Sequence, residues 1–355
     1  MFQCAVQRLE QAVAQGVCPS AALAIGTGEE VLTEACFGVH NLEQNPLPVT
    51  PDTLYDMASI SKVLATAMVA LRFVEDGLLR LDDNMDVFFP GVLPDKRDIT
   101  IRQLMTHTSG MTAHFLLSEE ASTPARAAET ILAHPLVCAP GEQVIYSCMG
   151  YILLGKILEK LGAAPLDQLA KELVFAPLGM THTGYRPQTC DVASTERNPY
   201  SGQWLSGVVH DENARFLGGV SGNAGVFSNL RDMERFGRML LNEGGLDGVQ
   251  LLSPAALQAA CRNYTAGLSE NRGLGFKLAL GSGNFMGDLV SPGAFGHTGF
   301  TGTSLLVDPG RNLFVVLLTN RVHPTRDNLQ LIRFRGLLHN LILSDWSRSG
   351  REAAQ

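Results

Sequence analysis

The sequence predicts an α+β fold in which both ends of the chain contribute to one sheet. Stretches typical of strands occur near the start and again after residue 246, whereas apolar residues at helical spacing fill most of the chain between them. Helices inserted between two groups of strands favour an α+β arrangement. The predicted division is a sheet domain of residues 1–78 and 247–355 and an inserted, mostly helical domain of residues 79–246.

The first 41 residues predict a helix followed by two strands. Residues 1–20 have an amphipathic helix pattern, without the basic start and continuous apolar core of a signal peptide. A cytoplasmic location is therefore expected, although export is not excluded. Residues 21–41, "AALAIGTGEEVLTEACFGVHN", indicate two strands joined at a tight turn that contains glycine.

From Lys62 to about Asn242 the pattern is mostly helical or loop-like, and strands then return. The helical spacing of apolar residues is clearest in residues 99–111, 125–136, 150–162 and 166–180. Later strands are predicted in residues 274–281, 301–309 and 312–320, and a last helix in residues 327–343.

The composition excludes several classes of protein. A content of 45% hydrophobic and 17% charged residues is ordinary for a globular protein, and a net charge of −8 argues against nucleic-acid or anionic-membrane partners. No apolar run approaches the roughly 20 residues of a membrane span. Seven cysteines without a C-x-x-C pair fit reduced thiols better than disulfides or zinc. The oligomeric state is not readable.

The stretch "ASISKVLATAM", residues 58–68, carries the strongest chemical signal. Ser59 opens a helical pattern, and Lys62 lies three residues later, close enough along a helix to contact it. The helix is apolar nearly all round, which is typical of a buried helix. Lys62 therefore either extends to water near the helix start or acts as a base beside the serine.

The chemical explanation carries definite expectations. A serine hydroxyl is a weak nucleophile that needs a neighbouring base. Burial and the positive end of the helix are expected to lower the pKa of Lys62. Backbone N–H groups at the helix start would contribute to an oxyanion hole at Ser59. S-x-x-K alone is a weak motif, so companion motifs are needed.

Two companion motifs are present, one beginning at Tyr146 and the other at His297. Together the three motifs resemble the serine β-lactamase and penicillin-binding-protein superfamily, most closely its class C branch with the related D,D-carboxypeptidases and β-lactamase-like esterases. Further segments in the expected order extend this resemblance over nearly the whole chain. The three motifs are Ser59-x-x-Lys62, Tyr146-Ser147-Cys148 and His297-Thr298-Gly299.

The resemblance implies an antiparallel sheet flanked by the N- and C-terminal helices, with an active site in the cleft beside the inserted domain. Ser59 would be the acylated nucleophile, Lys62 a base or proton relay, and Tyr146 the group that carries a proton to the leaving group. Because a phenol is a poor base at neutral pH, Tyr146 needs a nearby cation, which Lys62 or His297 could supply. Backbone N–H groups of Ser59 and Phe300 would form the oxyanion hole.

The resemblance also implies that Cys148, His297, Thr298 and Gly299 bind the substrate, with two departures. His297 replaces the usual lysine, although histidine is common in the esterase-like and carboxypeptidase-like branches. Cys148 replaces the usual asparagine, and a thiol is a poor substitute for an amide, so recognition of a substrate amide is weakened. A nucleophilic Cys148 is a minor alternative.

Other residues of the resembling segments carry weaker expectations. His107 is interpreted as structural, holding a loop through its ring nitrogens, and the pair His210-Asp211 as lining the pocket without a catalytic role. Asn223 stands where related sequences often have histidine, with no derived consequence. Without the resemblance, Tyr146 would be read as a packing residue and His297 as a turn residue.

Together these observations predict a serine hydrolase with an acyl-enzyme at Ser59, acting on a small ester or a D-amino-acid-type amide without metal or organic cofactor. A D,D-carboxypeptidase, a penicillin-binding protein or a class C-like β-lactamase acting on a β-lactam is the alternative. A non-catalytic ligand-binding protein on the same fold is the alternative from another class. The sequence shows neither the G-x-S-x-G of an α/β-hydrolase nor the H-E-x-x-H of a metallohydrolase.

Overall fold

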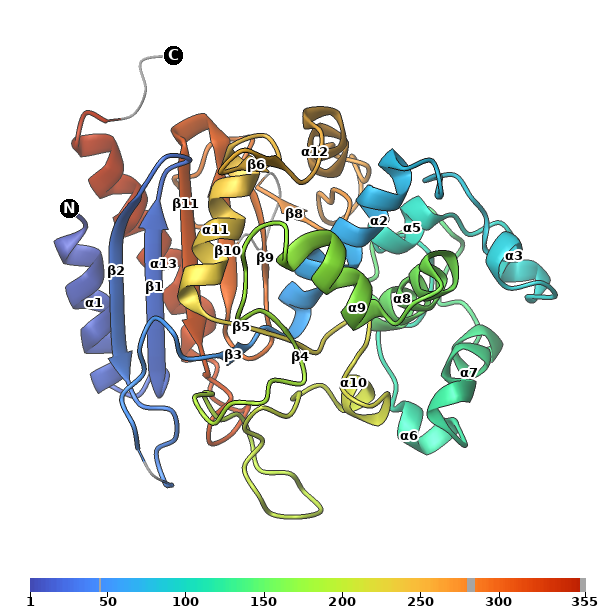
Figure 1. The fold of residues 1–355 in the computed structure, drawn as a ribbon, viewed down its shortest axis with the longest axis horizontal. Helices are drawn as coiled ribbons and strands as arrows, with labels where there is room; N and C mark the ends of the chain where they lie inside the picture. Colours follow the sequence, from blue (N-terminus) through green and yellow to red (C-terminus); the bar gives the residue numbers. More distant parts are fainter. Residues whose placement is uncertain (45, 280–284, 352–355) are drawn as a thin grey trace.

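A six-stranded antiparallel sheet forms the centre of the computed structural model, which describes residues 1–44, 46–279 and 285–351. The strand order is β2-β1-β11-β10-β9-β8, so strands from both ends of the chain lie side by side (Figure 1). The α+β prediction is therefore confirmed. The strands are β1 (Ser20–Gly26), β2 (Val31–Gly38), β8 (Lys277–Leu278), β9 (Phe295–Thr298), β10 (Ser304–Asp308) and β11 (Leu313–Thr319).

Both faces of the sheet are covered. Helices α1 (Gln3–Ala14) and α13 (Gln330–Arg348) lie on one face, and α11 (Leu230–Leu241) packs on the other (Figure 1). Alternate side chains of a strand point to opposite faces. Accordingly, Leu317 of β11 packs with α1 and α13, whereas the adjacent Leu318 belongs to the core that contains α11.

The helical region packs around α8 (Cys148–Gly162). This helix is apolar and largely buried, and the Ser147 hydroxyl caps its start by accepting a hydrogen bond from the Gly150 N–H at 3.1 Å. The other helices are α2 (Ala67–Glu75), α3 (Met85–Phe88), α4 (Pro94–Arg97), α5 (Ile101–Met105), α6 (Leu117–Glu120), α7 (Ala127–Ala133), α9 (Leu166–Ala170), α10 (Glu212–Phe216) and α12 (Pro254–Cys261). Within the described residues, no helix is long and apolar enough to cross a membrane.

Several short strands were missed by the sequence analysis, both within the region predicted as helical or loop-like and on either side of it. A three-stranded sheet is formed by β3 (Tyr55–Asp56), β5 (Val226–Ser228) and β4 (Gly184–Tyr185) in that spatial order. Strands of two or three residues are too short to display an alternating pattern. A small hairpin, β6 (Gly245–Leu246) and β7 (Val249–Gln250), follows α11.

The later strands are shorter than the sequence predicts. In the predicted strand 274–281 only β8 forms, and residues 280 and 281 lie outside the described residues. The division at residues 79–246 stays a prediction. Helix α11 belongs to that range in sequence but packs on the sheet.

Gly237 allows α11 to lie close to β11. A Cβ atom built on Gly237 would lie 2.8 Å from the ring of Phe314, which is completely buried. Gly336 of α13 provides a matched comparison, because a Cβ there would meet its nearest neighbour, the Cα of Gly287, at 3.9 Å. The glycine in α11 is therefore required by packing, whereas the glycine in α13 is not.

We expect Gly237→Ala to lower the free energy of unfolding by about 1–3 kcal/mol, because overpacking outweighs the better helix propensity of alanine. Gly336→Ala should be neutral or stabilising by up to about 1 kcal/mol. Urea unfolding of both variants and the wild type measures the difference. Equal changes in the two variants would contradict the close packing of α11 on β11.

Candidate active site

Ser59 lies in an irregular helical segment at the edge of the small sheet. A 3₁₀ turn, Ala58–Ile60, follows β3 and leads through a π-helical turn, Lys62–Thr66, into α2. Ala58 has φ +45°, a conformation that is unfavourable for a residue with a side chain. The Asp56 carboxylate holds it there by accepting a hydrogen bond from the Ala58 N–H at 2.8 Å. The strained backbone presents the half-buried Ser59 at the start of the helix.

Lys62 is completely buried and contacts Ser59 directly. Its Nζ donates hydrogen bonds to Ser59 Oγ at 3.1 Å and to the Asn223 carbonyl at 2.8 Å, and lies 3.7 Å from Cys148 Sγ. The alternative in which Lys62 extends to water is therefore wrong. A buried amine next to a serine hydroxyl is the arrangement that nucleophilic catalysis requires.

The expected pKa of Lys62 is wrong in sign. Burial lowers the pKa of the Lys62 ammonium, but the negative charges that Cys148 and then Tyr146 carry when ionised raise it by more. The pKa therefore lies above the ordinary lysine value. This rise depends on the ionised forms of Cys148 and Tyr146, and beside Ser59 the Lys62 amino group is a hydrogen-bond donor and, when protonated, a positive charge.

Two cations lie close to the ring of Tyr146. The Lys62 Nζ is 5.0 Å from the centre of its ring, and the Arg272 guanidinium is 5.3 Å from it. The Tyr146 hydroxyl oxygen is buried and has no hydrogen-bond partner among the described residues. Arg272 was missed by the sequence analysis because it belongs to no motif and lies 126 residues after Tyr146. It is itself buried and pairs with Glu270 at 2.8 Å.

His297 is not the cation that the sequence analysis considered. Burial, followed by the charges of Arg272 and Lys62, holds the pKa of His297 well below the usual histidine value, so its ring is neutral. Its Nδ1–H donates to the Thr298 carbonyl at 2.9 Å, which leaves Nε2 as an unprotonated acceptor. Nε2 is buried and has no partner within the described chain.

The loop after β9 lies directly against the nucleophile segment. The Thr301 hydroxyl donates to the Asp56 carbonyl at 2.7 Å, and the Thr303 hydroxyl donates to the Met57 carbonyl at 3.3 Å. A Cβ at position 299 would lie 2.6 Å from the Met57 carbonyl, so only glycine fits. These contacts hold the backbone of Phe300 next to the segment that carries Ser59.

Cys148 begins α8 with its Sγ in contact with Lys62. Burial raises the pKa of the Cys148 thiol more than the charge of Lys62 lowers it. A protonated thiol is a poor nucleophile. The geometry therefore disfavours the alternative in which Cys148 attacks the substrate.

The other motif residues have structural contacts. The His107 ring accepts a hydrogen bond from the Ser147 N–H through Nδ1 at 3.1 Å and packs on the Tyr146 ring, with centroids 4.3 Å apart. Asp211 caps α10 by accepting from the Ala214 N–H at 2.8 Å. The expectation that His210 lines the pocket is wrong, because it packs behind Phe300, with ring centroids 5.7 Å apart.

A cleft of about 480 Å³ opens beside Ser59. Ser59, Tyr146, His297, Thr298 and Gly299 all line it, so the three sequence motifs meet at one place, whereas Cys148 and the pair His210-Asp211 are not among its described lining residues. Its other described lining residues are Glu270, Arg272, Lys277, Phe285, Phe300, Arg321, Leu329, Ile332 and Arg335. Four of these are basic and one is acidic, which makes the cleft attractive to anions.

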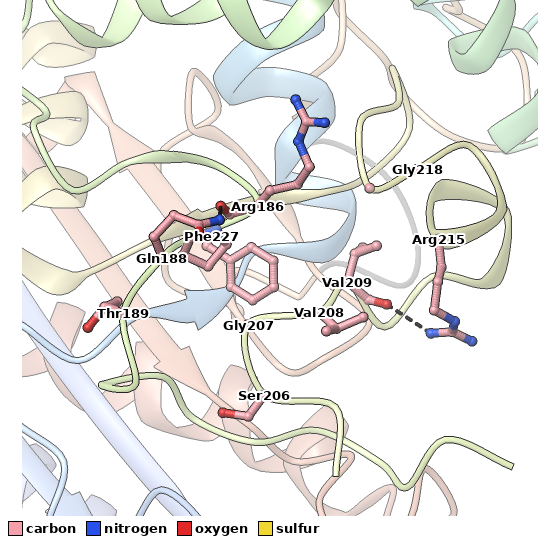
Figure 2. Close-up of a pocket in the computed structure, with 12 residues that line it drawn as sticks. Arg186, Gln188, Thr189, Ser206, Gly207, Val208, Val209, Arg215, Gly218 and Phe227 are labelled. Atoms are coloured by element: carbon pink, nitrogen blue, oxygen red, sulfur yellow. Dashed lines mark hydrogen bonds between the residues drawn. The ribbon is translucent and has the colours of Figure 1, made fainter. Parts of the chain in front are cut away.

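A second hollow, of about 420 Å³, lies between the segments around Arg186 and Val208 (Figure 2). Arg215 at its edge donates a hydrogen bond to the Val209 carbonyl at 2.8 Å. None of its described lining residues is a histidine, cysteine, lysine or carboxylate. It therefore offers no general base and no activated nucleophile. Within the described residues, no group of three or more His, Cys, Asp or Glu side chains could hold a metal ion.

Comparisons with known proteins agree with this geometry. The Beta-lactamase family matches residues 5–340. An Escherichia coli (strain K12) protein named "Putative D-alanyl-D-alanine carboxypeptidase" is 33% identical over 322 residues, which cover 79% of this chain and 72% of that protein.

Two solved structures share the fold at low sequence identity. Unliganded simvastatin synthase (LovD) from Aspergillus terreus has a TM-score of 0.75 and 22% identity to this chain. The matched region covers 97% of this chain and 98% of the synthase chain. EstCE1, described as a hydrolase with promiscuous acyltransferase activity, has a TM-score of 0.75 and 22% identity to this chain. The matched region covers 95% of this chain and 98% of the EstCE1 chain.

We expect Lys62→Met to lower the rate at which Ser59 is acylated by about 10²–10⁴-fold, because the positive charge beside Ser59 and Tyr146 is lost. Methionine fills most of the space, so the variant should remain folded. The rate of labelling by a fluorophosphonate measures the effect. Lys156→Met is the control, because Lys156 is partly exposed and pairs with Glu159 at 2.8 Å. A wild-type rate in folded Lys62→Met would contradict the role of Lys62.

Proposed function

The chain belongs to the Beta-lactamase family, and from that premise we propose that it is a serine hydrolase that forms an acyl-enzyme at Ser59. The observation that carries the proposal is the hydrogen bond of 3.1 Å from the completely buried Lys62 to Ser59 Oγ. Burying an ammonium is costly unless it is paired. If Lys62 had only a structural role, its hydrogen-bond partner Ser59 would not need to line an open cleft.

In the proposed acylation step, Ser59 Oγ attacks the substrate carbonyl and transfers its proton to Tyr146 in the ionised form. The positive charges of Lys62 and Arg272 lie 5.0 and 5.3 Å from the centre of its ring. The backbone N–H groups of Ser59 and Phe300 would stabilise the negative charge that develops on the carbonyl oxygen. Tyr146 then gives the proton to the leaving group, and the Ser59 ester remains.

Deacylation would reverse these roles with water in place of the leaving group. Water attacks the Ser59 ester and passes a proton to Tyr146, which returns it to Ser59 Oγ as the product leaves. His297 contributes an unprotonated Nε2 at the cleft wall, which can accept a hydrogen bond from the substrate or the attacking water. These steps use only groups of this chain.

The charges of the cleft favour a substrate with a carboxylate. Arg321 and Arg335 are buried, and within the described chain they donate hydrogen bonds only to backbone carbonyls. Arginines without a carboxylate partner are suited to bind an acidic group. A D-amino-acid-type amide with a free carboxyl group, as in a D,D-carboxypeptidase substrate, satisfies this requirement.

A small ester is the second substrate candidate. The thiol of Cys148 replaces the amide that would recognise a substrate amide, and three exposed apolar side chains line the cleft, Phe300, Leu329 and Ile332. Apolar side chains at the cleft suit an apolar acyl group. A β-lactam combines an amide with a carboxylate and remains a third candidate, and a non-catalytic binding protein is the alternative from another class.

The cytoplasm is the compartment that we propose, on one structural observation. All seven cysteines are free, which fits a reducing environment. The division into a sheet domain and a helical insertion, with the cleft between them, is likewise part of this proposal.

The first test is intact mass after exposure to a fluorophosphonate and, separately, to a labelled penicillin. Adducts with both reagents that disappear in Ser59→Ala would support the nucleophile and favour a penicillin-binding or carboxypeptidase activity. A Ser59-dependent adduct with the fluorophosphonate alone would favour the ester. No adduct on folded wild type would contradict catalysis and leave the binding protein.

Replacing the thiol tests substrate choice. We expect Cys148→Asn to raise kcat/KM for a D-alanyl-D-alanine peptide, relative to p-nitrophenyl acetate, by roughly three- to tenfold, because one net hydrogen bond is worth about 0.5–1.5 kcal/mol. Cys148→Ser is the control, since a hydroxyl does not reproduce the amide. An unchanged ratio in Cys148→Asn would show that residue 148 does not contact the substrate amide.

A further inference from the structure

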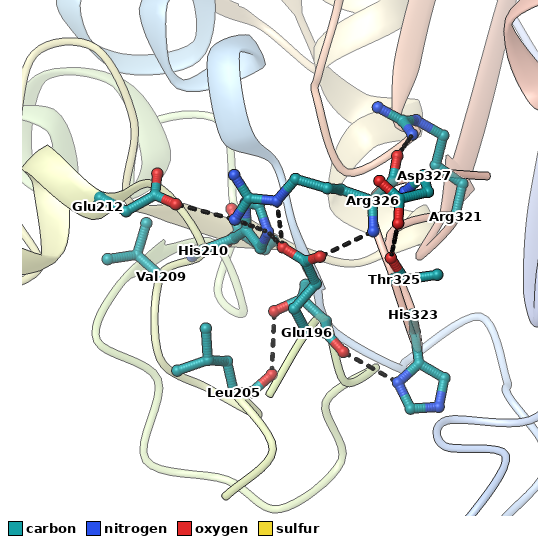
Figure 3. A network of polar contacts seen from close by, with 12 residues as sticks. Glu196, Leu205, Val209, His210, Glu212, Arg321, His323, Thr325, Arg326 and Asp327 are labelled. Atoms are coloured by element: carbon teal, nitrogen blue, oxygen red, sulfur yellow. Dashed lines mark hydrogen bonds and ion pairs between the residues drawn. The ribbon is translucent and has the colours of Figure 1, made fainter. Parts of the chain in front are cut away.

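A charged cluster connects three segments that are far apart in the sequence (Figure 3). The His210 Nε2–H donates to the Glu196 carboxylate at 2.7 Å. The other Glu196 oxygen accepts from the backbone N–H of Arg326 at 2.8 Å, and the Arg326 guanidinium also pairs with Glu212 at 2.8 Å. Glu196 is thus bonded to both of the other segments.

The first connection of this cluster to the cleft is the ring of Phe300. The His210 ring is stacked against it at 24° and 5.7 Å, and the guanidinium groups of Arg321 and Arg326 lie 4.8 and 5.8 Å from its centre. Although Phe300 is 49% exposed, an imidazole and two guanidinium groups border its ring. Cations over an aromatic face are attracted to it.

The second connection leads to Ser59. The backbone N–H of His210 donates to Asp56 Oδ2 at 2.7 Å, and Asp56 Oδ1 accepts from the Ala58 N–H at 2.8 Å. The Asp56 carbonyl accepts from the Thr301 hydroxyl at 2.7 Å. Asp56 therefore holds both Ala58, which precedes Ser59, and Thr301, which follows Phe300. His210 in turn holds Asp56.

Glu196 is suited to keep this arrangement fixed. Burial by itself would raise the pKa of Glu196, but hydrogen bonds from His210 and Arg326 lower it to about 2. Its carboxylate is therefore ionised over the range in which proteins are normally folded, and it accepts several hydrogen bonds at once.

We propose that Glu196, His210 and Arg326 form a positioning unit for the oxyanion hole that the backbone N–H groups of Ser59 and Phe300 make. None of the three residues lines the cleft, so they act through Phe300 and Asp56 and not by touching the substrate. Preorganised donors lose effect when they are displaced, because they must match the position of the developing charge. This inference rests on the proposed acyl-enzyme at Ser59.

The test measures fluorophosphonate labelling of Ser59 as a function of reagent concentration, which separates the maximal rate from the half-saturating concentration. We expect Glu196→Gln and Arg326→Met each to lower the maximal rate by about ten- to a hundredfold, since removing an oxyanion-hole donor costs about 10²–10³-fold. The half-saturating concentration should change by less than about threefold, because ground-state binding is untouched. Arg326→Lys should retain most of the rate.

Glu43→Gln is the matched control. Glu43 pairs with Arg197 at 2.7 Å, and this pair also joins distant segments but is about half exposed and lies outside the cluster. Its variant should label like the wild type. Melting temperature and near-ultraviolet circular dichroism show whether each variant is folded.

The outcomes separate this inference from the proposed function. Wild-type maximal rates in folded Glu196→Gln and Arg326→Met would overturn the positioning unit while leaving the nucleophile intact. A loss that only follows the unfolded fraction would also overturn it, because the cluster would then be a structural support. Wild type that is not labelled at Ser59 would overturn the proposed function and this inference together.

Discussion

The buried ammonium of Lys62 is the constraint on which the rest of the site depends. A charge that is fully removed from water must be hydrogen-bonded, and its partners come from three separate segments: Ser59 on its own helix, the carbonyl of Asn223, and Cys148 at the start of α8.

The segment that carries Asn223 must therefore approach the helices very closely. Gly222 permits this, because a Cβ there would collide with the Tyr151 carbonyl, and the Thr66 hydroxyl donates to the Gly222 carbonyl at 2.7 Å. Gly222 thus has a packing reason.

The charges around Tyr146 follow from the same constraint. Two cations, Lys62 and Arg272, lie about 5 Å from its ring, and together with burial they keep His297 neutral. A protonated His297 would add a third positive charge in a confined space. One group of cations therefore borders the ring of Tyr146 and leaves an acceptor nitrogen on His297, so the two side chains can have different roles within one cleft.

Local sequence pattern predicted the parts of this molecule that rest on periodicity and short spacing. The strands of residues 20–26 and 31–38, the strands at the other end of the chain, and the proximity of Ser59 and Lys62 all follow from positions that are close in sequence. The direction of the Lys62 pKa shift did not follow, because it depends on Cys148 and Tyr146, which the fold brings in from other segments. Arg272 and the two- and three-residue strands that flank Ser59 carry no local signal.

The short strands show why the nucleophile needs more than its own helix. Pairing of Asp56 with Phe227 fixes the end of β3, and Asp56 then imposes the left-handed conformation of Ala58 through its carboxylate. That conformation is unfavourable by about 1–3 kcal/mol, so it persists only where the surroundings enforce it. Hydrogen bonds from Thr301 and His210 to Asp56 provide the enforcement from two further segments. The strained conformation of Ala58 and the polar contacts that maintain it are consequently two parts of one arrangement. This arrangement fixes the direction in which Ser59 points.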